Sequence, residues 1–195
     1  MPAATRRCGW AELLAHPEVN EVASVGSPVG LMAYHGGLEA GTAEIASAAA
    51  DAVGASLYVV DQPAGLRWHV PSHEVDPTRS PVLAEWLGHV EVVITLHGYG
   101  RYLRPRHLLL GGRNRGLADH VGAHLRARLT GFEAVTDLAA IPSELRGLHR
   151  SNPVNVPPRA GVQLELPPAV RGCETHRRQV SAALADAVRS WPTGP

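Results

Sequence analysis

Short apolar runs alternate with amphipathic helical segments along most of the chain, and this alternation limits the folds that it can adopt. The clearest apolar run, residues 91–96, contains the consecutive β-branched residues VVI, which are typical of a strand buried on both faces. Residues 42–53 instead place their apolar side chains at helical spacing and are followed by Gly54, a common helix terminator. Such a pattern predicts an α/β protein whose mostly parallel or mixed central sheet is flanked by helices.

The same reasoning places the individual elements. We expect strands at residues 29–34, 56–60, 66–70, 91–96, 107–110 and 161–166. We expect helices at residues 42–53, 81–87, 117–129 and 175–191. No linker or repeat divides the chain, so residues 1–195 are expected to form a single domain, with residues 1–20 as a candidate peripheral N-terminal segment.

Composition excludes several classes of function. Eighteen basic residues, all of them arginine, balance eighteen acidic residues, so the chain lacks the charge of a general nucleic-acid binder and the lysine of a Schiff-base or P-loop mechanism. Its two cysteines cannot form a disulfide framework, and no apolar run approaches the ~20 residues of a membrane span. We therefore expect a cytoplasmic protein without nucleic-acid or membrane partners. The oligomeric state stays open.

Eleven histidines against one phenylalanine point to metal or acid–base chemistry. In the segment HGGLE, His35 and Glu39 are four residues apart across two glycines, which favour a tight loop that turns both side chains toward one point. His97 follows the expected central strand, and ligands of α/β proteins bind beyond the carboxyl ends of such strands. Two close ligands and a distant third are the layout of a catalytic zinc site, although for any one histidine at a strand end a structural role is the more common case.

Glu165 lies in the expected late strand, between Leu164 and Leu166. Alternation in a strand puts its carboxylate on the face opposite both leucines. A carboxylate near a metal-activated water is suited to take the water's proton and return it to a leaving amine. The competing interpretation is a surface glutamate on an edge strand, in which case Glu74 or Glu144 would be the next candidates for the base.

Taken together, these segments resemble the poly-γ-glutamate hydrolase family, zinc-dependent enzymes related to phage-encoded hydrolases, with a core similar to that of zinc carboxypeptidases. The matching pieces follow the family's order along about two-thirds of the chain. They are residues 35–46, 69–76, 96–98, 111–113, 155 and 161–166.

The resemblance implies a zinc carboxypeptidase-like core with one zinc ion per chain, bound by His35, Glu39 and His97, and Glu165 as general base and acid. It implies cleavage of an amide bond next to a carboxylate-bearing residue, γ-glutamyl above all, in a small peptide or γ-glutamyl substrate with a free carboxylate.

Recognition of that carboxylate needs a cation, which in a chain without lysine is an arginine or the metal. Arg113 follows the glycine pair after the strand expected at residues 107–110, and Asn114 is next to it. By analogy with the adjacent Asn and Arg of zinc carboxypeptidases, both are candidate substrate-binding residues, with Arg159 as a further candidate. His69 is expected close to the site, supporting a ligand or contacting substrate.

Three alternatives remain open at this stage. His120 and His124 are spaced i, i+4 on an expected helix and could share a metal, but surface histidines are the more common case. The set of His35, Glu39 and His97 would also suit a zinc deacylase of N-acyl amino acids. A non-catalytic binding module that kept the fold is the third alternative, and the complete set of ligands and base argues against it.

Overall fold

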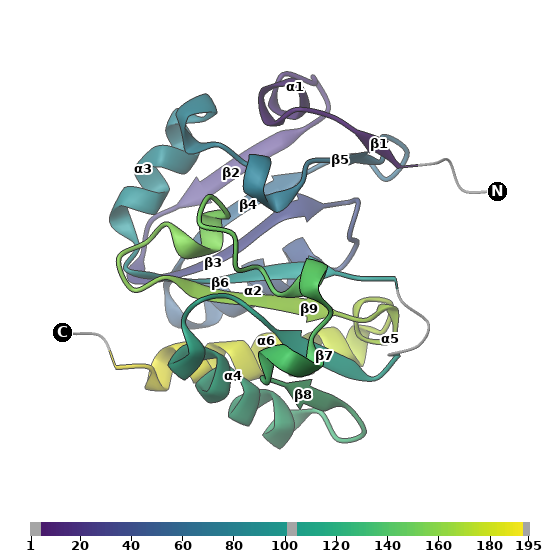
Figure 1. Ribbon diagram of the computed structural model, residues 1–195, viewed down its shortest axis with the longest axis vertical. Coiled ribbons are helices and arrows are strands. Elements are labelled where there is room, and N and C mark those ends of the chain that lie inside the picture. The colour runs from purple at the N-terminus through teal and green to yellow at the C-terminus, as the bar shows by residue number, and fades with distance from the viewer. Residues whose placement is uncertain (1–4, 101–104, 193–195) are drawn as a thin grey trace.

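The computed structural model describes residues 5–100 and 105–192. Seven strands form a mixed sheet in the order β2-β4-β3-β6-β9-β7-β8 (Figure 1). In chain order they are β2 (Asn20–Ser24), β3 (Ser27–Gly36), β4 (Ala55–Asp61), β6 (Val92–Gly98), β7 (His107–Leu110), β8 (Glu133–Val135) and β9 (Gly161–Leu166). The four strands β4, β3, β6 and β9 are parallel, whereas β2 and β7 run antiparallel to β4 and β9. The expected α/β fold with a mixed central sheet is confirmed.

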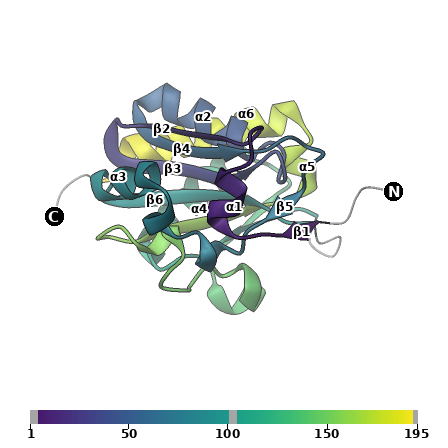
Figure 2. The ribbon, with the colours of Figure 1, turned by 90° about the horizontal axis from the view of Figure 1, so that it is seen from above.

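Helices cover both faces of the sheet. They are α1 (Trp10–Leu14), α2 (Thr42–Val53), α3 (Pro81–His89), α4 (Arg115–Arg128), α5 (Pro168–Arg171) and α6 (Glu174–Ser190). Buried side chains of α2, α4 and α6 pack with those of β3, β6 and β9 in the larger core, and Figure 2 shows α2 and α6 on the same side of the sheet. None of the helices in the described ranges is both long and apolar enough to cross a membrane.

The second face of the sheet packs against α1 and α3. Its core contains Tyr34 of β3, Trp86 of α3, and Trp10 and Leu13 of α1. The segment expected to be peripheral therefore contributes three buried side chains to this core, Cys8 and the α1 residues Trp10 and Leu13.

Strand alternation divides the two central strands between these faces. Leu96 of β6 and Leu164 of β9 pack in the core with α2, α4 and α6. Their neighbours His97, Gln163 and Glu165 point to the opposite face and are buried there. Polar side chains thus gather at the carboxyl ends of β6 and β9, where α/β proteins place their ligands.

The strand expected at residues 66–70 differs from prediction. Only β5 (Trp68–His69) forms, and it pairs with β1 (Arg6–Arg7) in a separate two-stranded sheet. Arg67 has a positive φ of 52°, which interrupts the extended run just before Trp68. The edge strands β2 and β8 lack a continuous apolar run and were not expected.

Candidate metal centre and active site

The end of β3 and the turn that follows it carry the first two candidate ligands. His35 is the last residue but one of β3, and its carbonyl accepts a hydrogen bond from the backbone N–H of Glu39 at 2.8 Å. Gly37, between them, has φ +73°, and a Cβ there would lie 1.8 Å from the carbonyl oxygen of Gln62. This position therefore requires glycine, and the tight loop expected from the sequence is present.

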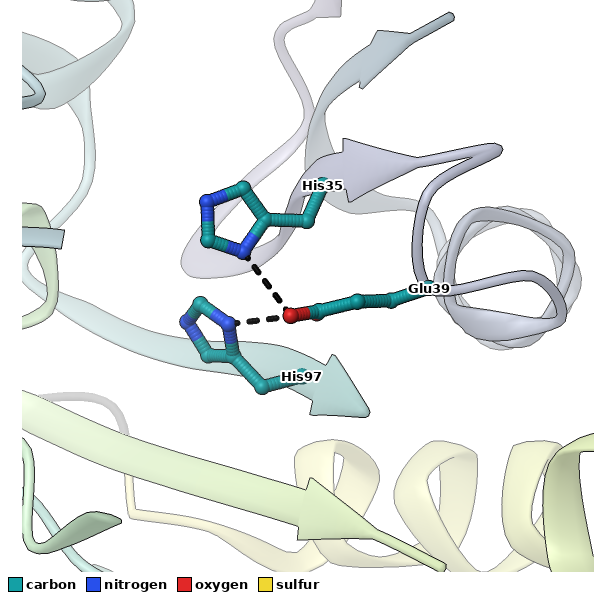
Figure 3. A group of neighbouring side chains, drawn as sticks. All are labelled: His35, Glu39 and His97. Carbon is teal, nitrogen blue, oxygen red and sulfur yellow. Dashed lines mark hydrogen bonds and ion pairs between the residues drawn. The ribbon is translucent and has the colours of Figure 1, made fainter. Parts of the chain in front are cut away.

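Glu39 lies between two imidazoles (Figure 3). Its Oε1 is 3.1 Å from Nδ1 of His35, and its Oε2 is 3.3 Å from Nδ1 of His97. The three residues offer ligand atoms that all lie within 4.8 Å of one another. In a tetrahedral zinc site with bonds of ~2.0–2.1 Å, two ligand atoms lie about 3.4 Å apart.

A β-bulge brings His35 to this point. Between Ala33 and Gly36, β3 advances three residues while its partner β4 advances two, from Val59 to Asp61. The extra residue breaks the alternation, so the consecutive rings of Tyr34 and His35 both lie against His97, with centroids 4.9 and 5.0 Å from it.

The second nitrogen of each histidine determines which tautomer the ring adopts. Nε2 of His35 lies 2.9 Å from the carbonyl oxygen of Val70, which only accepts, so Nε2 donates. Nε2 of His97 lies 3.0 Å from the Tyr34 hydroxyl, which itself donates to Oδ1 of Asn152 at 3.5 Å and so accepts from His97. In their neutral forms both histidines therefore turn an Nδ1 lone pair toward Glu39.

This arrangement fits a metal ion. Two lone-pair nitrogens that face carboxylate oxygens repel them unless a cation lies between them, either a proton or a metal. Carbonyl and hydroxyl partners on the outer nitrogens are the usual second layer of metal-binding histidines. Burial alone would raise the pKa of Glu39, but the positive charge that His35 and His97 carry when protonated lowers that pKa well below its usual range, so the carboxylate is ionised.

A buried hydrogen-bond chain connects His97 to Glu165. From the Tyr34 hydroxyl it passes to Asn152, whose Nδ2 donates to Oε1 of Gln163 at 2.8 Å. Nε2 of Gln163 donates in turn to Oε1 of Glu165 at 2.8 Å. Every donor points from the histidine toward the carboxylate, so the chain ends on a group that accepts.

Burial raises the pKa of Glu165 to about 7, and the nearby Glu39 carboxylate adds to the rise. His97 and the hydrogen bond from Gln163 act in the opposite direction. A carboxyl group with a pKa near neutrality can take up and release a proton at physiological pH, as a general base and acid does.

These side chains lie in a cleft with a volume of about 870 Å³. Ser72, Gly100, Ser143 and His149 also line it. His69 also lines the cleft, and its ring centroid is 4.9 Å from that of His35. The structure thus brings His69 beside the proposed ligands, as the sequence led us to expect.

The three other expected substrate residues lie elsewhere. The backbone N–H of Asn114 donates to the carbonyl of Gly161, the first residue of β9, and its side chain donates to the carbonyl of Arg159, just before β9. Arg113 is exposed, and neither it nor Arg159 is among the residues that line the cleft. Because β7 runs antiparallel to β9, the chain after Leu110 runs back along β9 and away from Glu165. Asn114 bonds to Gly161, which lies four residues, or about 13 Å of strand, before Glu165.

The alternative candidates for the metal ligands and for the base lie outside the cluster of His35, Glu39 and His97. His120 and His124 lie together on α4, and both ring Nε2 atoms contact the hydroxyl of Ser190, far along the chain from the cleft residues. Glu74 is paired with Arg7, and Glu144 lies on the rim of the cleft.

Sequence reasoning missed the three members of the chain between His97 and Glu165. Gln163 carried a usable signal, since it lies two residues before Glu165 and so shares its face of the strand. Tyr34 and Asn152 carried none, because a bulge orients the first and a long irregular loop delivers the second.

Comparison with known families decides the class of protein. The family model described as poly-gamma-glutamate hydrolase matches residues 11–183. The chain belongs to the poly-γ-glutamate hydrolase family. It is accordingly a hydrolase of the class that acts on γ-glutamyl amide bonds, which confirms the sequence-based expectation. No curated protein has a sequence that matches this chain significantly.

Several solved structures share the fold of this chain. A bacteriophage poly-gamma-glutamate hydrolase aligns with a TM-score of 0.73 and 23% identity, over 88% of each chain. YNDL, in a zinc-free form, aligns with a TM-score of 0.74 and 23% identity, over 89% of this chain and 90% of its own. A protein from Burkholderia mallei assigned as a carboxypeptidase aligns at 0.58 and 10% identity, over 91% of this chain and 64% of its own. The fold of this hydrolase is thus carboxypeptidase-like, as expected.

Proposed function

We propose that this hydrolase is a zinc enzyme that cleaves γ-glutamyl amide bonds, with His35, Glu39 and His97 binding one zinc ion and Glu165 acting as general base and acid. The observation that carries the proposal is the placement of Nδ1 of His35 and Nδ1 of His97 at 3.1 and 3.3 Å from the two oxygens of Glu39. The cleft above them is large enough for a peptide-sized substrate.

When bound there, zinc would supply a Lewis acid that lowers the pKa of a water and polarises an amide carbonyl. The chain's own residues do the rest. Glu165 accepts the proton that the attacking water loses. As the amide C–N bond breaks, Glu165 delivers this proton to the leaving nitrogen, so the carboxylate is regenerated at the end of the cycle.

The surroundings of Glu165 suit this role. Gln163 fixes Oε1 of the carboxylate by a hydrogen bond, so the group is held in one orientation. Burial removes competing solvent from it and raises its pKa toward neutrality. His69 lies in the same cleft beside His35 and is placed to contact the substrate or to support the ligand.

A set of matched substrates tests the proposal. Oligo-γ-glutamate and oligo-α-glutamate of equal length carry the same charge and differ in the amide that joins their residues. We expect the zinc-loaded protein to cleave the γ-linked oligomer, a chelator to abolish cleavage, and added zinc to restore it. Equal or faster cleavage of the α-linked oligomer would contradict γ-glutamyl selectivity, and full activity after removal of all metal would contradict the zinc mechanism.

Substrate length separates this function from a deacylase of N-acyl amino acids. A deacylase would hydrolyse N-acylglutamate as fast as a longer γ-glutamyl chain. The proposed function predicts faster turnover of the oligomer, because the cleft extends well beyond the ligand cluster to His73 and His149.

A further inference from the structure

Arg171 is the last residue of the short helix α5. Its side chain donates hydrogen bonds to three backbone carbonyls: Nε to Leu166 at 3.1 Å, Nη1 to Ala40 at 3.1 Å and Nη2 to Tyr99 at 3.4 Å. These carbonyls belong to three segments that are far apart in the sequence. One planar guanidinium therefore fixes all three relative to one another.

Each carbonyl adjoins one of the proposed functional residues. Ala40 directly follows Glu39, and Leu166 directly follows Glu165. Tyr99 comes two residues after His97. We propose that Arg171 is a positioning residue, which sets the relative placement of Glu39, His97 and Glu165 through the backbone that follows each of them.

Two glycines, Gly98 and Gly41, make room for Arg171. A Cβ at Gly98 would lie 2.4 Å from Nε of Arg171, so a larger residue would displace the guanidinium. A Cβ at Gly41 would lie 2.8 Å from the carbonyl oxygen of Arg171. The segments after His97 and Glu39 thus approach Arg171 as closely as their backbones permit.

Electrostatics agree with this arrangement. Burial lowers the pKa of Arg171, whereas the carboxylates of Glu39 and Glu165 raise it and so favour its charged form. Arg171 is not among the residues that line the cleft, so it acts on the reaction through the segments that it holds and not by touching the substrate.

The inference rests on the proposed function, and substitution by lysine tests it. Lysine keeps the positive charge but lacks the fork that reaches three carbonyls. For Arg171→Lys we expect zinc affinity, measured by competition with a chelator, to fall about 10-fold or more. This is the usual loss of metal affinity when a residue that supports the metal ligands is replaced. Turnover per folded, zinc-saturated molecule should fall while KM changes little, because the substrate is not contacted. Arg171→Gln gives the same readouts if the lysine variant folds poorly.

Arg115 offers a matched control. Its guanidinium also holds backbone carbonyls, those of Leu110, Gly111, Gly112 and Thr136, and its pKa is also lowered by burial. Arg115→Lys should lower the melting temperature and leave zinc affinity and turnover per folded molecule unchanged.

Two results would overturn the inference. One is an Arg171→Lys protein that melts earlier but keeps wild-type zinc affinity and turnover per folded molecule. The other is an equal loss of both in Arg115→Lys. Failure of the proposed function itself is distinguishable, since the wild-type protein would then bind no zinc or cleave no γ-glutamyl amide.

Discussion

His97 and Glu165 are directly paired across the adjacent parallel strands β6 and β9. Both side chains are buried on the face of the sheet away from α2, α4 and α6. A slip of one residue in this register would turn Glu165 into the apolar core and move the leucines on either side of it out of that core. The burial of these two leucines therefore fixes the register. The separation between a proposed ligand and the proposed base is thus set by the ladder of a central sheet and not by a loop.

The first prediction concerns metal content. His97→Ala removes one of three proposed ligands and should strip most of the zinc while the far-ultraviolet circular dichroism stays close to that of the wild type. His120→Ala is the control, because His120 lies on α4 outside the cluster. Elemental analysis of both purified variants gives the answer. Full zinc occupancy in the His97 variant would remove this residue from the ligand set.

The second prediction separates the base from the ligands. Glu165→Gln keeps the shape of the side chain but cannot accept a proton, so turnover should fall ~100-fold or more, the usual scale of general acid–base catalysis. Zinc content should stay at one ion per chain. Glu144→Gln, on the rim of the cleft, should stay within a few-fold of the wild type. Wild-type turnover in the Glu165 variant and a large loss in the Glu144 variant would transfer the role of base to Glu144.

The third prediction addresses the hydrogen-bond chain. Tyr34→Phe removes the hydroxyl that accepts from His97 and donates to Asn152, with little change in volume. Loss of such a partner of a metal-binding histidine costs about 10- to 100-fold in metal affinity. We expect zinc affinity to fall within that range. Tyr58→Phe is a suitable control, because Tyr58 is equally buried but bonds to Glu21, outside the cluster. An unchanged affinity in Tyr34→Phe would show that the tautomer of His97 does not depend on this hydroxyl.

A fourth prediction follows from the raised pKa of Glu165. An ordinary glutamate titrates near 4.5, whereas Glu165 titrates at about 7 in the folded protein. Between these values the folded state binds more protons than the unfolded state, so the contribution of Glu165 to the free energy of unfolding decreases as the pH rises. Glu165→Gln lacks this contribution. In urea unfolding of the metal-free proteins, the wild type should lose stability relative to the variant between pH 5 and pH 8. A constant difference would contradict the raised pKa.

The parts of the site predictable from sequence are those that depend on local pattern. Two glycines between His35 and Glu39 imply a tight turn, and an unbroken apolar strand before His97 implies a position at the carboxyl edge of the sheet. Alternation around Glu165 predicts the face on which it lies. Each inference needs only neighbouring residues and the periodicity of a strand.

The missed parts depend on long-range geometry. Residues 107–110, with three consecutive leucines, predict a strand, but their pattern is the same whether that strand runs parallel or antiparallel to β9. Its antiparallel direction is what carries Arg113 to the far edge of the sheet. Likewise, the three carbonyls held by Arg171 come from segments that meet only after folding, so no local motif marks that residue.

The last prediction tests the antiparallel direction of β7 through its effect on the role of Arg113. A substrate carboxylate read by Arg113 would make Arg113→Ala lose about 10- to 100-fold in kcat/KM, the equivalent of a charge-assisted hydrogen bond. The structure instead places this exposed side chain outside the cleft, so we expect kcat/KM to stay within about two-fold of the wild type. His69→Gln, inside the cleft, should raise KM for γ-glutamyl oligomers and have a smaller effect when the free carboxylates are amidated. Steady-state kinetics of both variants on both substrates decide the point. A large loss in Arg113→Ala that disappears on amidation would return Arg113 to the substrate site and require the segment after β7 to reach the cleft.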